Sequence, residues 1–337
     1  MTRAAAVAIL CAALLAGGAK EEKAAEFLGL ARAGDVWRLK EILEKGYNVD
    51  TADKSGTTAL AYAAGGGHTD TVQLLLRYGP GTQSKEQAVG IAASRGFVDV
   101  VRTLIEAGVP ESAASLALAA ACTNNHLEIF QLLLRAGASP NATIQNVPMI
   151  HLTAHANNTE LLEALVLAGA DLRRTDPQGR TPLAAAVAQG NSDSAQMLLA
   201  FGSEVNAADG EGVTPLLIAT AMGRNELIRL LLAAGADANW RDKGGRTPLM
   251  TATRQGRAQA IRLLVAFGSR VDDRDNMGRT PLMEAVAQSR ADMVRALLES
   301  NSNPSLRDPS GLSILLMAQR RRNAEVTELL RQYGAQP

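Results

Sequence analysis

The tripeptide Thr-Pro-Leu recurs at a fixed interval in the second half of the chain. It begins at Thr181, Thr214, Thr247 and Thr280, so each copy starts 33 residues after the one before. A degenerate copy, Ser-Ile-Leu, starts a further 33 residues along, at Ser313. A regular period of this length is typical of solenoids, in which each small unit buries its apolar side only by stacking on its neighbours. This period constrains the fold more than any other feature of the sequence.

The copy that starts at Thr247 shows what one unit contains. Thr is a good helix N-cap, and Pro248 suits the first helical position because its missing N–H costs nothing there. Asp242 and Gly245, just before it, have the chemistry of a tight turn. An apolar first helix follows, and a second apolar helix ends at Gly268, which is placed to adopt the left-handed conformation. Each unit is therefore predicted to be a turn followed by two helices.

At the Thr-Pro-Leu segments the chain resembles the ankyrin-repeat family, whose consensus reads Thr-Pro-Leu-His-x-Ala. The resemblance implies an all-α ankyrin-repeat solenoid, with helix-turn-helix units joined by short β-hairpin loops. It is strong from residue 170 onward and weaker before it. With the Gly or Asn that ends each second helix as the anchor, ten repeats cover residues 20–337. Their predicted starts lie near residues 25, 58, 87, 116, 148, 181, 214, 247, 280 and 313.

Two departures from the family pattern lead to specific expectations. The steps into the third and fourth repeats are 29 residues instead of 33, which predicts shortened hairpin loops near residues 80–87 and 109–116. The consensus His is replaced by an apolar residue in most repeats, and the segment 148–151 alone keeps it, as His151. Because that His ties adjacent repeats together in the family, the ties in this chain are expected to be apolar.

Residues 1–19 have the pattern of a secretory signal. Arg3 precedes a 13-residue apolar run, Ala4–Ala16, which is shorter than the ~20 residues that a membrane-spanning helix needs. The pattern predicts a periplasmic or secreted protein with no stable membrane insertion after cleavage, and a cytoplasmic one if residues 1–19 are not a signal. Cleavage would leave Cys122 as a single cysteine, so the fold must form without an internal disulfide.

The candidate chemical sites each have a simpler structural explanation. His151 and His155 have the spacing of metal ligands on a helix, but no third ligand is evident. Cys122 and His126 have the spacing of a nucleophile and a base, but the family often has a His at the start of the second helix. The glycine run 65–67 lacks the strand and the Lys-Ser/Thr of a phosphate loop. The sequence therefore predicts a protein that is not an enzyme, with no bound metal and no cofactor.

The resemblance instead places the function on a surface. Ankyrin stacks contact partners through their hairpin tips and the exposed ends of their first helices, and we call these positions the concave face. In the last five repeats the projected positions hold ten basic residues and one acid, Glu211, although the whole chain has 34 basic and 34 acidic residues. This asymmetry predicts a basic face that binds an acidic protein surface. The predicted partner-binding residues are Arg180, Arg241, Lys243, Arg246, Arg254, Arg274, Met277, Arg279, Arg307, Arg320 and Arg321.

The favoured interpretation is a monomeric, non-catalytic scaffold for protein–protein interaction. One alternative is a binder of polyanions such as nucleic acid, lipopolysaccharide or acidic polysaccharide, and another is a secreted effector that acts on a host protein. Nucleic acid is disfavoured, because only 3% of the residues are aromatic and single strands are bound largely by stacking. A further alternative concerns the arginines themselves, which could pair with the turn aspartates of neighbouring repeats and leave little free charge.

Overall fold

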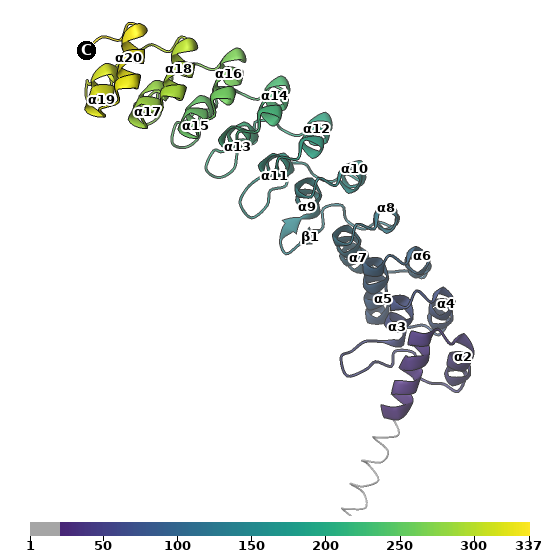
Figure 1. Cartoon of the computed structure of the whole chain (residues 1–337). Coiled ribbons are helices and arrows are strands. Elements are labelled where there is room, and N and C mark those ends of the chain that lie inside the picture. The colour runs from purple at the N-terminus through teal and green to yellow at the C-terminus, as the bar shows by residue number, and fades with distance from the viewer. Residues whose placement is uncertain (1–20) are drawn as a thin grey trace, which may run out of the picture. The chain divides into compact units, whose positions relative to one another are not determined.

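The computed structural model describes residues 21–337 as two units of stacked helix pairs (Figure 1). The first unit runs to Ile144 and includes residues 167–169, and the second comprises residues 145–166 and 170–337. Each is an all-α repeat solenoid, as the sequence predicts. The predicted signal segment, residues 1–19, lies outside the described residues. In the described part of the chain, no helix is both long enough and apolar enough to cross a membrane.

The first unit consists of helix pairs and one short strand. Residues 21–33 are helical, and the following elements are α2 (Val36–Glu44), α3 (Ala59–Gly65), α4 (Thr69–Arg77), α5 (Thr82–Arg95), α6 (Val98–Glu106), α7 (Glu111–Thr123), α8 (Leu127–Arg135) and β1 (Thr143–Ile144).

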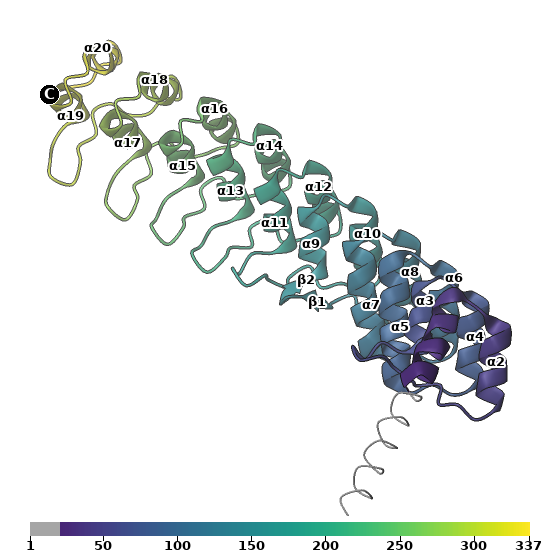
Figure 2. The same ribbon diagram turned by 60° about the horizontal axis from the view of Figure 1, so that its bottom comes forward.

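The second unit continues the pattern with greater regularity. Its elements are β2 (Val147–Pro148), α9 (Met149–His155), α10 (Thr159–Leu167), α11 (Pro182–Gln189), α12 (Ser192–Ala200), α13 (Pro215–Met222), α14 (Asn225–Ala233), α15 (Pro248–Arg254), α16 (Ala258–Ala266), α17 (Pro281–Ala287), α18 (Ala291–Glu299), α19 (Ile314–Arg320) and α20 (Ala324–Gln332). From α11 onward, the first helices of the repeats lie in one row and the second helices in another (Figure 2).

The predicted start and stop signals of the repeat are confirmed. Thr247 is the N-cap of α15, its hydroxyl oxygen accepts a hydrogen bond from the Met250 N–H at 3.3 Å, and Pro248 occupies the first helical position. At the other end of the unit, Gly268 has a φ of +87°. The same side-chain cap forms at Thr58, Thr181, Thr214, Thr280 and Ser313.

The core of each repeat is a thin apolar layer. In the repeat that contains α15 and α16, Leu249, Ile261 and Leu264 are completely buried. First helices pack on first helices of adjacent repeats, as α13 does on α15 and α15 on α17, and second helices pack on second helices. Because every layer is covered by its neighbours, small and medium-sized side chains are enough to exclude water.

The third and fourth repeats have shorter loops before their first helices, as expected, but most of the segments 80–87 and 109–116 is helical. Residues 82–95 and 111–123 are helices of 14 and 13 residues, whereas α15 has 7. The hairpin tip is replaced by an extension of the first helix at its N-terminus. In α5, the carboxylate of Asp50 caps this extension from the preceding loop, because it accepts hydrogen bonds from the Gly81 N–H at 3.0 Å and the Ser84 hydroxyl at 2.6 Å.

The expectation that adjacent repeats are tied together only by apolar contacts is wrong. Asn191, the first residue before α12, donates hydrogen bonds from Nδ2 to the carbonyl oxygens of Ala154 and His155, at 3.0 Å and 2.7 Å. Asn323 makes a similar bond to Ser289 at 3.2 Å. These polar ties stand at the start of the second helix, whereas the consensus His stands at the start of the first.

Candidate partner-binding face

Three of the predicted arginines are held by the turn aspartate of their own repeat. Arg246 donates from Nε and Nη2 to Asp242 Oδ2, both at 2.8 Å, and its backbone N–H donates to Oδ1 at 2.9 Å. The Asp242 side chain is 6% exposed and the Arg246 side chain 45%. The same clamp joins Arg180 to Asp176 and Arg279 to Asp275. The partner of each arginine is therefore in the same repeat, four residues earlier, and not in the neighbouring repeat.

The turn itself explains why these pairs form. In the turn that Asp176 opens, one carboxylate oxygen accepts the backbone N–H groups of Gln178 and Arg180, and the other oxygen is left for the Arg180 guanidinium. Burial alone would raise the pKa of Asp176, but the hydrogen bonds and charge of Arg180 outweigh it, so the pKa lies below its ordinary value. Each clamp is an ion pair and adds almost no net charge to the face.

Three further arginines hold neighbouring hairpin tips together. Arg241 donates from Nη2 to the carbonyl oxygen of Arg274 at 2.6 Å. Arg274 donates to the carbonyl oxygens of Gly278 at 2.7 Å and Arg307 at 2.9 Å, and Arg307 donates to an oxygen of Pro337 at 2.9 Å. A peptide carbonyl oxygen does not neutralise a guanidinium, so Arg241 and Arg274 remain positively charged while they fix neighbouring tips in place, and Arg307 fixes its tip to Pro337.

The side chains of the remaining predicted residues are exposed and make weak contacts or none. Lys243 pairs with Glu211 at 3.4 Å, but both side chains are largely exposed, and such a pair contributes little. Met277 is 67% exposed. Within residues 21–337, Arg254 and Arg321 form no hydrogen bond or ion pair through their side chains. Both stand at the C-terminal end of a first helix.

Arg320 completes the group of cations at the helix ends. It is the last residue of α19, and its charge contributes to the lowered pKa of Asp308, whose main cause is the hydrogen bond from Ser310. Four of the ten basic residues predicted for the face are in ion pairs with acidic side chains: Arg180, Lys243, Arg246 and Arg279. The basic character of the face therefore rests on the other six, which are Arg241, Arg254, Arg274, Arg307, Arg320 and Arg321.

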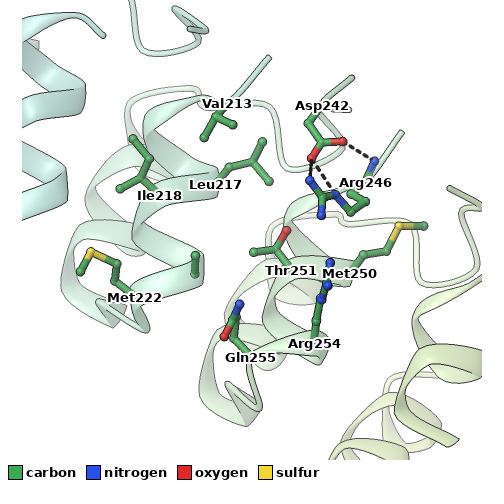
Figure 3. Close-up of a pocket in the computed structure, with 11 residues that line it drawn as sticks. Val213, Leu217, Ile218, Met222, Asp242, Arg246, Met250, Thr251, Arg254 and Gln255 are labelled. Atoms are coloured by element: carbon green, nitrogen blue, oxygen red, sulfur yellow. Dashed lines mark hydrogen bonds and ion pairs between the residues drawn. The ribbon is translucent and has the colours of Figure 1, made fainter. Parts of the chain in front are cut away.

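A cavity of about 300 Å³ opens between α13 and α15 (Figure 3). Side chains of α13, among them Leu217 and Met222, form one wall, and Met250 and Arg254 of α15 stand opposite. Leu217 and Met250 are 3% and 5% exposed, whereas Met222 is 45% exposed at the rim. Most of its lining is apolar, so the charge pattern of the sequence gives no sign of this cavity.

A family model that describes ankyrin repeats, three copies to the model, matches four overlapping or adjacent segments of the chain, residues 27–114, 78–144, 150–242 and 223–308. The chain belongs to the ankyrin-repeat family. No curated protein matches it. Ankyrin repeats generally mediate protein–protein interaction, and the family is typically a non-catalytic interaction module.

Two histidines of this ankyrin-repeat chain, considered above as a metal ligand and as a base, form hydrogen bonds to the backbone of an adjacent repeat. His151 is 2% exposed, and its Nε2 lies 2.8 Å from the carbonyl oxygen of Arg180, so it ties α9 to the turn of the next repeat. His126 Nε2 lies 3.2 Å from the carbonyl oxygen of Ser94. Burial raises the pKa of Cys122 to about 11, so its thiol stays protonated at neutral pH and is a poor nucleophile. No group of three or more His, Cys, Asp or Glu that could hold a metal occurs within residues 21–337.

His151 is expected to make stability depend on pH. Burial is the main cause of a His151 pKa below the ordinary 6.5. The hydrogen bond to the Arg180 backbone and the charge of Asp176 oppose it, and the charges of Arg180 and Arg174 add to it. The folded chain thus binds fewer protons at His151 than the unfolded chain does. Its contribution is complete above pH 6.5 and is lost as the pH falls through the folded pKa. Thermal unfolding at about pH 7.5 and about pH 5 should therefore show a larger loss in the wild type than in His151→Gln.

His155→Gln is the matched control, because His155 lies on the same helix and is exposed. It should keep the pH dependence of the wild type. An equal loss of melting temperature in the wild type and in His151→Gln would show that the acid sensitivity arises elsewhere.

Proposed function

We propose that the second unit binds an acidic protein surface through its concave face, with Arg254, Arg320 and Arg321 as the residues that contact the partner's carboxylates. The observation that carries this proposal is that the Arg254 and Arg321 guanidiniums have no ion pair or hydrogen bond within residues 21–337. A guanidinium presents several donors in a planar fork, which suits bidentate contact with a carboxylate.

The rest of the face supports this role by its rigidity. The Asp–Arg clamps fix three of the turns, Arg241 and Arg274 hold neighbouring tips at constant spacing through carbonyl oxygens of the next repeat, and Arg307 holds its tip to Pro337. A surface fixed before binding loses little conformational entropy when the partner docks. The six arginines without an acidic partner also attract an acidic surface over about 8–10 Å at physiological salt, which favours fast association.

The experiment begins with capture of partners by residues 20–337 from the native compartment, followed by mass spectrometry. The dissociation constant of the captured protein is then compared for the wild type and for Arg254→Gln/Arg320→Gln/Arg321→Gln. An exposed charge pair contributes about 0.2–1 kcal/mol, so the loss of three is expected to weaken binding about tenfold.

A matched control removes the same number of charges from the second helices. Arg229, Arg262 and Arg295 are exposed on α14, α16 and α18, and their combined replacement by glutamine is expected to change binding less than about twofold. Equal weakening by both triple variants would indicate that net charge alone matters, as for a non-specific polyanion binder. A wild-type chain that captures no acidic protein at low salt would contradict the proposal.

A further inference from the structure

The cavity between α13 and α15 is best understood by comparison with the next junction along the stack. The next junction, between α15 and α17, leaves only about 20 Å³, against about 300 Å³ here. At that junction the position before the N-cap holds Arg246 and the seventh position after it holds Arg254, and both line the small cavity. One repeat earlier, the same positions hold Val213 and Ala221. Two short apolar side chains in place of two arginines therefore open the hollow.

The walls of this hollow combine an apolar floor with a cation at the edge. Leu217 and Met250 line it as buried side chains, and Ile218 and Met222 add further apolar surface. Arg254 stands at the rim, and its guanidinium has no acidic partner within the described residues. The neighbouring Arg246 uses Nε and Nη2 for Asp242, so Arg254 is the cation available to a ligand.

The size and the lining point to one kind of occupant. A volume of about 300 Å³ is at the lower end of small-molecule pockets and equals roughly ten water molecules in the liquid. Water makes few hydrogen bonds to an apolar lining, so its displacement by an apolar group is favourable. A carboxylate beside the apolar group would meet Arg254 by charge complementarity.

We propose that this cavity anchors a peptide segment of the partner by taking one large apolar side chain, while an adjacent carboxylate of the same segment pairs with Arg254. This inference deepens the proposed function and rests on it. The six arginines attract the acidic surface, and the cavity selects the segment and sets its register on the face.

The test uses fluorescent peptides of one pattern, Gly-Asp-Asp-X-Asp-Asp-Gly, in which X is Leu, Met, Phe or Ala. The carboxylates on both sides of X provide for either direction of binding. Fluorescence anisotropy with the chain 20–337 is expected to show that at least one large apolar X binds about tenfold tighter than Ala, a difference of about 1.4 kcal/mol. In chain labelled with ¹³C at the methionine methyl groups, the Met222 and Met250 signals should shift with that peptide.

Two substitutions fill the cavity by different chemistry. Val213→Arg introduces the residue that stands at the equivalent position of the next repeat. The new guanidinium can pair with the Asp209 carboxylate, as Arg246 pairs with Asp242. Ala221→Leu fills the hollow without a charge. Both are expected to reduce the preference for the large side chain to less than about threefold, and circular dichroism verifies that each variant is folded.

A matched control adds the same charge away from the cavity. Leu312 is the equivalent of Val213 in the last repeat, where Asp308 accepts its backbone N–H. Leu312→Arg should keep the tenfold preference. Because Val213→Arg adds a positive charge, a gain in binding of all peptides without loss of the preference would show simple electrostatic attraction and overturn the inference.

The proposed pairing of a peptide carboxylate with Arg254 is tested separately. Exchange of the four Asp residues of the peptide for Asn should weaken binding to the wild type, and less so to Arg254→Gln. Salt-dependent binding of all the acidic peptides with no preference for a large X would overturn the anchor and leave the proposed function standing. No binding of any acidic peptide at low salt would overturn both.

Discussion

Replacement of Asp242 by alanine is expected to lower the free energy of unfolding by about 3 kcal/mol, because it leaves Arg246 without its acidic partner. The carboxylate is 6% exposed and receives both the backbone N–H and the guanidinium of Arg246, at 2.8–2.9 Å. Removal of one partner from a buried ion pair typically costs about 3–5 kcal/mol. The lower end applies because the Arg246 side chain is 45% exposed and can turn toward water.

The repeat before it offers a matched control. Asp209 opens the same turn and accepts the backbone N–H groups of Glu211 and Val213, both at 2.9 Å, but Val213 provides no guanidinium. Asp209→Ala should therefore cost only about 1–2 kcal/mol, for two hydrogen bonds. Urea unfolding followed by circular dichroism measures both variants, and hydrogen exchange localises the loss to one repeat, since solenoids unfold in parts. Equal costs would mean that the ion pair contributes nothing.

The local features of the repeat could be predicted from the sequence. A threonine before proline defines the start of α15, and Gly268 marks the end of α16, because both signals depend on backbone chemistry within a few residues. The sequence also indicates that arginines could pair with turn aspartates, but it places the partner in the neighbouring repeat. The structure pairs Arg246 with Asp242 of its own repeat, because one carboxylate oxygen accepts the backbone N–H and the second oxygen is left for the guanidinium.

Other features depend on residues that are distant in the sequence, or on small side chains that leave space unfilled. The extension of α5 relies on Asp50, which lies 31 residues before Gly81, so no local pattern predicts a helix there instead of a loop. The cavity beside α13 arises because Val213 and Ala221 are small where the next repeat has Arg246 and Arg254. Charged and reactive residues in the sequence give no sign of it, because short apolar side chains leave the space open.

Replacement of Gly245 by alanine is the second change with a large expected effect, about 3 kcal/mol in the free energy of unfolding. Its φ is +72°, which costs an L-residue about 1–2 kcal/mol. An added Cβ would also overlap Asn276 Oδ1 and lie 2.8 Å from the Asn276 backbone N. The adjacent tip would have to move away, which breaks the hydrogen bonds from Asn276 to the carbonyl oxygens of Gly244 at 3.1 Å and Lys243 at 2.9 Å.

Gly268→Ala separates the steric overlap from the backbone strain. Gly268 also has a positive φ, +87°, but an added Cβ there would meet nothing within 4 Å. It should therefore cost only the strain, about 1–2 kcal/mol. Urea unfolding gives both costs, and faster hydrogen exchange of the Asn276 amide in Gly245→Ala alone would show that the tips have separated. If the two alanine variants were equally stable, the close packing of neighbouring tips would not contribute to stability, and the concave face would not be held rigid in the way that the proposed function requires.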